Sequence, residues 1–357
     1  MLRKIKNFIK SYYLKRGRKL KNQYVIIESD DWGAVRSTPK SIQFLKSIDK
    51  YNELDSYQRY DCLETHDDLQ KLYEVLIKFK DKKGRHPLFQ LNYIMQNLKT
   101  INFNNGSFEL VNTFDYYGKD GLRIKNIISN GIKNNVFLPQ LHGLWHLNIE
   151  QLIEDCKKNN IIKECFTNYG AVGYGEGIMK GMDTFADHNN FSGSIVKAAN
   201  IFNEEFGFMP KSVIFPCYTW AKDQEDELLE LDIKTIQGSL FQYDPRNKKR
   251  KMHFNGQKNR KGQFYFVRNV FFEPNKDRIK GTLNKCVENS MSEIKTAFKN
   301  SKPAIICTHR CNFVGSIDRS VRDQNLELLK KLLERILEEF PDCEFISTCE
   351  LKSIIGD

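Results

Sequence analysis

The sequence lacks several features that would place it outside the cell or in a membrane. No stretch of its 357 residues approaches the roughly 20 consecutive apolar residues of a membrane-spanning helix. The basic N-terminus has no apolar segment followed by small residues, as a secretory signal would. Nine cysteines occur without a CxxC pair, and without an export signal they are expected to be free, buried thiols. These absences predict a cytoplasmic protein.

Most of the chain also has almost no excess of basic over acidic residues, although the formal net charge is +11. Residues 1–22 hold nine Lys and Arg and no acidic residue, which leaves 47 basic against 45 acidic residues in the remainder. A second basic cluster lies within residues 246–261. Because the charge is confined to a tail and one loop, the sequence does not indicate a nucleic-acid-binding protein.

Hydrophobic residues make up 40% and charged residues 28% of the chain, which is typical of a globular protein with a sizeable core. Short apolar runs alternate with amphipathic segments. Strands are expected at 24–28, 87–93, 136–141, 212–215, 233–237, 264–272, 304–308 and 344–347. Helices are expected at 39–50, 66–82, 122–133, 149–159, 188–206, 223–231, 283–300 and 321–340.

About eight strands separated mostly by helices indicate an α/β protein with a parallel sheet. A (β/α) barrel, closed or incomplete, suits this pattern better than an open doubly wound sheet, which usually carries a Gly-rich phosphate loop that is missing here. We expect one barrel domain over 23–357, after a basic amphipathic segment at 1–22. Insertions into the barrel are expected near 102–120, 170–181 and 244–262.

Polar residues follow the ends of several expected strands, at the face where barrel enzymes assemble their sites. These residues are Asp30 and Asp31, His142, Tyr218 and His309.

Two histidines follow the expected strand 136–141. His142 and His146 are four residues apart, so their imidazoles converge if the segment turns as a helix, a frequent source of two zinc ligands. The spacing alone is a weak signal, because chance or packing also produces it. A carboxylate would complete a three-ligand site with positions open for water. We expect Asp31 to supply it.

Asp30 is the expected base. Two adjacent carboxylates repel, which raises the pKa of one unless a cation neutralises the other. A metal on Asp31 leaves Asp30 ionised and able to take a proton from water. His309, at the end of the expected strand 304–308, is the expected acid that protonates a leaving amine or alcohol. The alternatives are a solvated Asp-Asp turn and a structural histidine.

Together these residues resemble polysaccharide deacetylases of the NodB-homology type, carbohydrate esterase family 4. The resemblance covers roughly residues 24–355 and rests on short motifs in the family's order. It implies a distorted (β/α) barrel of about seven to eight strands, one divalent metal ion, commonly zinc, and hydrolysis of N-acetyl groups on sugars. The roles it implies match those above: base Asp30, acid His309, and metal ligands Asp31, His142 and His146.

The chain departs from the family pattern at two motifs. Trp32 stands between the aspartate pair and the glycine that usually follows it. Phe215 occupies the position of the arginine that orients the base, and Arg268 or Arg310 is a candidate substitute. Tyr218, in the same motif, could stabilise the oxyanion through its backbone N–H. A partner for His309 has no clear equivalent, and Asp232 is a weak candidate.

The substrate expected from this resemblance is an acetylated sugar or glycan, either small or lipid-linked. Trp32, Trp145 and Tyr218 are expected to stack on it, with Arg268 beside them, although barrel packing explains such aromatics equally well. Residues 1–22 place apolar side chains at helical spacing, which fits a helix on an anionic membrane or a helix in solvent or docked on the core. The competing functions are a glycoside hydrolase on a related barrel and a catalytically silent glycan-binding barrel.

Overall fold

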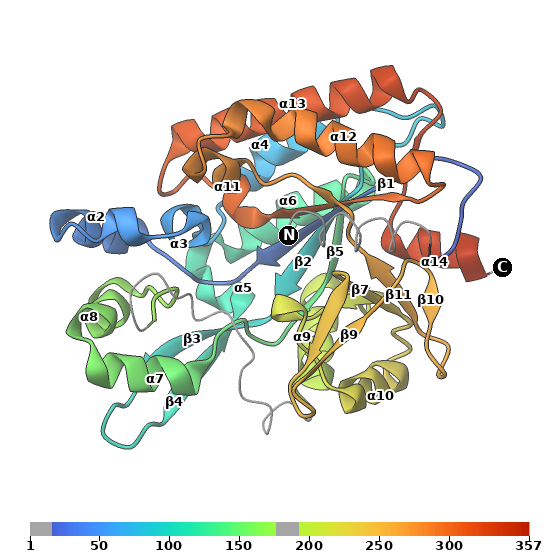
Figure 1. Ribbon diagram of the computed structural model, residues 1–357. Helices are drawn as coiled ribbons and strands as arrows, with labels where there is room; N and C mark the ends of the chain where they lie inside the picture. Colours follow the sequence, from blue (N-terminus) through green and yellow to red (C-terminus); the bar gives the residue numbers. More distant parts are fainter. Residues whose placement is uncertain (1–15, 176–192, 357) are drawn as a thin grey trace, which may run out of the picture.

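The computed structural model describes residues 16–175 and 193–356 and contains a curled, mostly parallel sheet that forms an incomplete barrel (Figure 1). Its strand order is β10-β11-β7-β6-β5-β2-β1-β13-β12, with β14 beside β1, and only the β10–β11 pair is antiparallel. The strands are β1 (Tyr24–Trp32), β2 (Phe89–Ile94), β5 (Phe137–Gly143), β6 (Ser212–Ile214), β7 (Thr235–Gly238), β10 (Gln257–Lys258), β11 (Phe264–Val267), β12 (Val270–Phe271), β13 (Ala304–His309) and β14 (Glu344–Phe345).

Helices connect these strands and cover the outside of the sheet. α6, α4, α13 and α12 pack side by side as one layer, while α9 packs against β5 and α10 packs against α9 (Figure 1). The helices are α2 (Pro39–Ser47), α3 (Ser56–Tyr60), α4 (His66–Leu76), α5 (Thr113–Tyr116), α6 (Gly121–Lys133), α7 (Ile149–Lys158), α8 (Asn160–Tyr169), α9 (Ser194–Phe206), α10 (Lys222–Glu230), α11 (Pro274–Ile279), α12 (Cys286–Lys299), α13 (Arg319–Glu339) and α14 (Thr348–Gly356).

The strands are short apolar runs because the helices bury the outer face of the sheet and the barrel interior buries the inner face. All nine residues of β1 are buried. The helices carry a single apolar stripe instead, as in α13, where Leu326, Leu329, Leu333 and Ile336 are buried at helical spacing. The distorted (β/α) barrel expected from the sequence is confirmed.

Polar side chains occupy part of the barrel interior, where branched apolar residues are more usual. Asn92 on β2 donates to Asp30 on β1 at 2.8 Å and to Gln237 on β7 at 3.1 Å. Thr348 donates to the buried Glu28 carboxylate at 2.5 Å. Because β2 and β7 are not neighbours in the sheet, these contacts cross the interior and satisfy groups that would be costly to bury alone.

Two expected elements end differently in the structure. The helix expected at 66–82 stops at Leu76. The strand expected at 264–272 is two strands, β11 and β12, with a break at Arg268 and Asn269. This break lets Arg268 turn towards β1, as described below.

The expected insertions form hairpins and loops around the barrel. The first contains most of a hairpin that begins earlier, with β3 (Gln96–Ile101) paired to β4 (Phe108–Asn112). The third contains the tip of a hairpin of β8 (Phe241–Asp244) and β9 (Lys249–Met252). The second, at 170–181, lies partly outside the described residues. Most of the N-terminal segment 1–22 lies outside them too, and its described part, 16–22, is not helical.

All nine cysteines are free. Seven are buried, as expected, whereas Cys217 is exposed and Cys349 is partly exposed. Among the helices in the described part of the chain, none is both long and apolar enough to cross a membrane.

Candidate active site

The two aspartates of β1 point into one pocket because the strand is irregular at its end. Successive side chains of a regular strand point to opposite faces of a sheet, so neighbouring residues would not normally share a site. Here the β1–β2 register shifts between Ser29 and Trp32, and Asp31 adopts a positive φ of 72°. Both Asp30 and Asp31 therefore line the same pocket.

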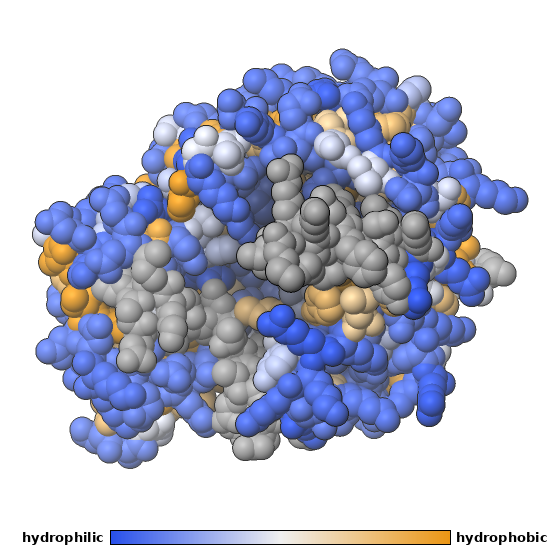
Figure 2. Space-filling model, in the orientation of Figure 1, coloured by the Kyte–Doolittle hydropathy of each residue, from blue (hydrophilic) through white to orange (hydrophobic). Residues whose placement is uncertain are grey.

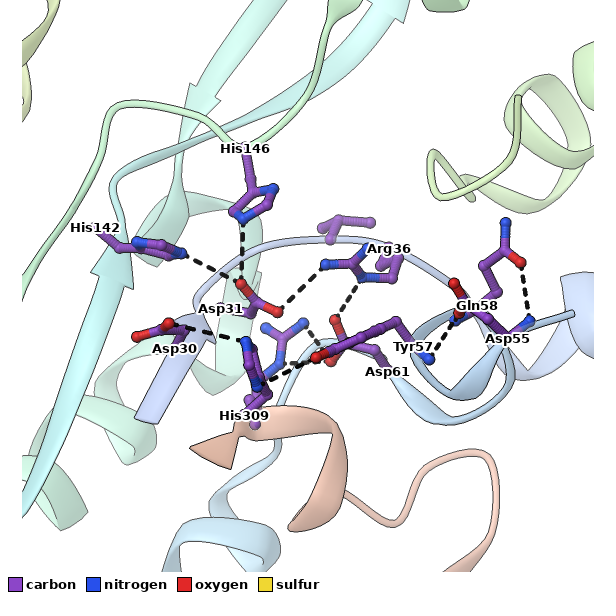
Figure 3. A network of polar contacts seen from close by, with 12 residues as sticks. Asp30, Asp31, Arg36, Asp55, Tyr57, Gln58, Asp61, His142, His146 and His309 are labelled. Carbon is purple, nitrogen blue, oxygen red and sulfur yellow. Dashed lines mark hydrogen bonds and ion pairs between the residues drawn. The ribbon is translucent and has the colours of Figure 1, made fainter. Parts of the chain in front are cut away.

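His142 and His146 converge on Asp31 (Figure 3). Their Nε2 atoms each lie 3.3 Å from the same Asp31 oxygen, Oδ1. His142 lies near the end of β5, and His146 lies in the loop before α7 rather than on a helix. The spacing of four thus brings the imidazoles together through a strand end and a loop, which corrects the helical turn assumed from the sequence.

The chemistry of this donor set fits a divalent metal ion. The Nδ1 atom of His142 lies 2.8 Å from the Ile214 carbonyl oxygen, which can only accept a hydrogen bond, so Nδ1 carries a hydrogen and Nε2 is the nitrogen that a metal ion would bind. Burial lowers the pKa of His146 to about 3, so this imidazole is neutral near pH 7. A divalent cation at this point could take the Asp31 oxygen and the two Nε2 atoms as ligands. Ligands of a tetrahedral zinc ion lie about 3.4 Å apart, close to the distances here.

Arg36 contacts the other oxygen of Asp31. Its Nη2 atom lies 3.3 Å from Asp31 Oδ2, and its Nε atom donates to Asp61 at 2.8 Å. Burial alone would raise the pKa of Asp31, but His146, His142 and Arg36 together hold it well below the usual range. Asp31 therefore has one oxygen engaged by Arg36 and one directed at the histidines.

Arg268 clamps Asp30. Its two terminal nitrogens lie 2.5 and 2.7 Å from the two Asp30 oxygens, and its Nε atom donates to Glu28 at 2.6 Å. Burial alone would raise the pKa of Asp30, but the Arg268 guanidinium outweighs it and holds the pKa at about 2. Arg268 thus makes the contact with Asp30 that is expected of the arginine replaced by Phe215 in the sequence motif. The other candidate, Arg310, pairs with Asp61 and Glu64 instead.

His309 faces Asp30 across the pocket. The parallel register of β1 and β13 pairs these two residues, and His309 Nε2 lies 3.8 Å from Asp30 Oδ2. On its other side, Nδ1 lies 2.5 Å from Glu273 Oε1, and Asn312 donates to the second Glu273 oxygen at 2.9 Å. Burial would lower the pKa of His309, but the Glu273 carboxylate raises it to about 9. The imidazole is therefore protonated near pH 7, with Nε2 directed into the pocket.

A buried network of ion pairs lies behind the residues that line the pocket. Arg310 donates to Asp61 at 2.8 and 3.0 Å and to Glu64 at 2.8 Å. Glu64 accepts the Gly33 N–H at 3.0 Å, which fixes the turn after β1. Since Arg36 also pairs with Asp61, a series of ion pairs leads from Asp31 through Arg36, Asp61, Arg310 and Glu64 to the turn that follows β1. The orientation of Asp31 therefore depends on residues outside the pocket.

The pocket has a volume of about 310 Å³. Figure 2 shows that this face of the molecule is hollowed below α11–α13 and that much of the visible wall is hydrophilic. The pocket is lined by Asp30, Asp31, Arg36, Tyr57, His142, His146, Phe215, Cys217, Tyr218, Phe271, Glu273, Lys276, Cys307 and His309.

Not all expected substrate contacts lie in this pocket. Trp32 is fully buried in the core, with its indole N–H donating to Ser29 at 2.9 Å, so no sugar can reach its ring. Trp145 is partly buried between the two larger core clusters and does not line the pocket. Arg268 is fully buried and contacts Asp30 rather than solvent. The irregular end of β1 turns Trp32 inward, which sequence position could not reveal.

Tyr218 does line the pocket, but its backbone N–H already donates to the Phe215 carbonyl at 3.0 Å. The oxyanion role expected for this N–H therefore does not fit the structure. Cys217 and Tyr218 both have positive φ, at 51° and 56°, so the motif forms a tight turn that directs the Tyr218 ring into the pocket.

Three residues of the site were not identified from the sequence. Glu273, rather than Asp232, is the carboxylate beside His309, while Asp232 pairs with Lys234 elsewhere. Tyr57 on α3 lines the pocket, and its hydroxyl oxygen lies 3.4 Å from His309 Nδ1 (Figure 3). Arg36 was also missed. The one available signal was the charged stretch that follows strand 264–272, where Glu273 precedes a proline.

Comparison with solved structures gives matches to carbohydrate-related barrels. A candidate glycoside hydrolase/deacetylase from Parabacteroides distasonis has a TM-score of 0.53 and 10% identity, over 93% of this chain and 71% of that chain. A 4-alpha-glucanotransferase from Thermococcus litoralis has a TM-score of 0.46 and 9% identity, over 94% and 40%. A candidate polysaccharide deacetylase from Mycobacterium smegmatis has a TM-score of 0.43 and 8% identity, over 95% and 93%.

At these identities the first match establishes the fold alone, and the other two carry no argument. No protein-family model matches the sequence, and no curated protein matches it.

Proposed function

We propose that the protein is a metal-dependent hydrolase that removes the acetyl group from an N-acetylated sugar. The observation that carries the proposal is the convergence of two imidazole Nε2 atoms on one Asp31 oxygen, 3.3 Å away in each case. Asp30 and His309 line the same pocket, with His309 Nε2 3.8 Å from Asp30 Oδ2, and would supply a base and an acid there. The match to a glycoside hydrolase/deacetylase barrel is consistent with a carbohydrate substrate.

Asp31, His142 and His146 would hold the metal ion, for which zinc is the expected identity. A divalent ion bound there would polarise the acetyl carbonyl and favour ionisation of a nearby water.

Asp30 would take the proton from the attacking water. Its pKa of about 2 keeps it ionised, and the two Arg268 contacts fix the direction of its free lone pairs. A base with so low a pKa is weak in isolation, so it depends on a cation to acidify the water. Asp30 would therefore act as a base only when the ion is bound.

His309 would donate the second proton. Its Nε2–H points into the pocket while Nδ1–H is held by Glu273, so the imidazolium can protonate the amine nitrogen as the carbon–nitrogen bond breaks. The Glu273 carboxylate orients the ring and stabilises its charged form. Asp30 would therefore take a proton from water and His309 would give one to the amine within the same pocket.

The same geometry disfavours the glycoside hydrolase alternative. That reaction needs two carboxyl groups about 5–10 Å apart that flank the scissile bond, one of them protonated. Here Asp30 is held ionised by Arg268, and Asp31 is engaged by Arg36 and two histidines. A catalytically silent glycan-binding barrel would be favoured if no arginine oriented the base. Arg268 contacts both oxygens of Asp30, which weakens this alternative.

The test combines metal content with turnover. Wild-type protein reconstituted with zinc should hold about one ion per chain and release acetate from an acetylated amino sugar, and the His142→Ala/His146→Ala variant should lose both. His66→Ala/His86→Ala is a matched control, since neither of these half-buried residues lines the pocket. Retention of full metal content by the His142/His146 variant would overturn the proposed site. A loaded enzyme that releases no acetate would overturn the reaction.

A further inference from the structure

An aromatic ring stands at the mouth of the pocket although most large apolar side chains are buried. Phe271 is 50% exposed and lines the pocket, whereas its neighbours Val270 and Phe272 are fully buried. Its backbone is fixed on both sides, because its N–H donates to Glu293 at 2.9 Å and its carbonyl accepts from Ser290 at 2.7 Å. The exposed ring therefore projects from a backbone that hydrogen bonds hold in place.

A cationic side chain, Lys276, also lines the pocket. It lies on α11 and is exposed. Its helix is anchored by the preceding residue, since the buried Asn275 donates to Cys311 at 2.7 Å and accepts from Asn325 at 2.8 Å. Within residues 16–175 and 193–356, Lys276 makes no ion pair, while Arg36, the other lysine or arginine of the lining, is held by Asp31 and Asp61.

These two side chains belong to the same short segment as Glu273. Phe271, Glu273 and Lys276 follow one another along β12 and the start of α11, and all three line the pocket in which Glu273 holds His309. The pocket volume of about 310 Å³ is at the small end for ligand sites, which suits one or two sugar rings better than a segment of polymer.

We propose that the substrate is a small N-acetylated sugar that carries an anionic group, with its ring against Phe271 and its anion at the Lys276 ammonium. This inference rests on the proposed deacetylase function and specifies its substrate class. A phosphate ester and a carboxylate share the required chemistry, since either can accept charge-assisted hydrogen bonds from a lysine. A neutral sugar would leave the ammonium without a partner in the complex.

The test compares three related probes on the zinc-loaded protein: N-acetylglucosamine, N-acetylglucosamine 1-phosphate and N-acetylmuramic acid. We expect kcat/KM to be at least about fivefold higher for one anionic probe than for the neutral one, a preference that 500 mM NaCl should reduce. The anionic probe that is preferred distinguishes phosphate from carboxylate. Lys276→Gln should reduce the anionic-to-neutral ratio to near one, whereas Lys280→Gln, at the end of the same helix and outside the pocket, should leave the ratio as in wild type.

Phe271→Ala should raise KM for all three probes by a similar factor, because a ring platform does not distinguish charge. Equal kcat/KM for neutral and anionic probes, with acetate still released, would overturn the substrate class and leave the deacetylase proposal standing. If no probe is hydrolysed, calorimetric binding of the same three probes decides the inference separately. Tighter binding of an anionic probe that Lys276→Gln abolishes supports it, and equal binding overturns it.

Discussion

Asp30 and Asp31 are neighbours in the chain, yet each has its own cation. Arg268 holds both oxygens of Asp30, and Arg36 holds one oxygen of Asp31. This division lets two carboxylates share a buried pocket without either taking up a proton, which would otherwise relieve their repulsion. It also leaves a single Asp31 oxygen for the histidines. The chemistry proposed for the pair thus depends on two arginines that approach from different parts of the chain.

Replacing Arg268 should destabilise the whole protein. Arg268→Met would leave the buried carboxylates of Asp30 and Glu28 without their cation, which typically costs about 3–5 kcal/mol. Chemical denaturation measures this loss. The control is Arg335→Met on α13, where the ion pairs with Glu288 and Glu339 are at the surface and the cost should be below about 1 kcal/mol. Equal effects of the two substitutions would mean that Arg268 is not the main counter-charge of these carboxylates.

The pairing of His309 with Glu273 should set the alkaline limit of activity. Glu273 raises the pKa of His309 to about 9, and the acid role requires the protonated imidazole, so activity should fall as pH rises through that value. Glu273→Gln keeps an acceptor for Nδ1–H but removes the charge, which lowers the pKa of His309. The alkaline limb of the kcat/KM profile should therefore move by at least about one unit to lower pH, with about a twofold loss at pH 8 for a shift of one unit and about a tenfold loss well above pH 9.

The measurement is the full pH profile of wild type and Glu273→Gln under zinc-saturated conditions. An alkaline limb that stays in place, even with lower activity, would show that Glu273 acts on ring position alone and that another group sets the limit.

At the scale of single elements, the end of β1 determines the geometry of the site. The shift in register, the positive φ of Asp31 and the turn at Gly33 all occur within residues 29–33. Gly33 has a φ of 78°, its N–H donates to Glu64, and a Cβ there would lie 2.7 Å from Thr113 and 2.8 Å from the Ile94 carbonyl. This turn therefore tolerates neither a different φ nor a side chain.

Gly33→Ala should consequently lower both stability and metal affinity. Gly84→Ala is a close control, because Gly84 has nearly the same φ, 77°, but a Cβ there would meet no atom of the described residues within 4 Å. Both variants carry the cost of a left-handed alanine, about 1–2 kcal/mol, and the excess for Gly33→Ala measures the clash. We expect that excess to exceed about 1 kcal/mol and zinc binding to weaken only in Gly33→Ala. Equal losses in the two variants would contradict a special role for this turn.

The same element shows what the sequence could and could not predict. Apolar runs located nearly every strand of the barrel sheet but not the two hairpins, and polar residues at the strand ends pointed to Asp30, Asp31, His142 and His309, since the carboxyl ends of parallel strands share one face. Trp32 could not be placed, because a bulge decides which way it points. Glu273 was missed because its contact with His309 follows from the pairing of β12 with β13, between segments that are distant in sequence. Arg268 was only one of two candidates until the break between β11 and β12 was known.

At the scale of the whole molecule, a stack of rings joins the pocket wall to the outer part of the sheet. Phe215 lines the pocket and stacks on Trp220 at 5.4 Å, Trp220 faces His253 at 5.8 Å, and His253 stacks on Tyr265 at 3.8 Å. His253 Nε2 lies 2.7 Å from the Gln242 side-chain oxygen, so the buried imidazole is held as a donor there. The stack ties the β8–β9 hairpin to the motif that carries Tyr218.

This buried histidine should make folding stability depend on pH. Burial, and to a smaller extent the nearby Lys251, lowers the pKa of His253 from 6.5 to about 3. Between these values the unfolded chain binds a proton that the folded protein does not, so stability is present above pH 6.5 and is lost as pH falls towards 3. The loss from this group is at most about 1.4 kcal/mol per pH unit. Denaturation of wild type and His253→Gln at pH 7, 6 and 5 measures it, and the variant should lose stability less steeply. Parallel slopes would mean that His253 becomes protonated in the folded state, which the close stacking on Tyr265 and the contact with Gln242 argue against.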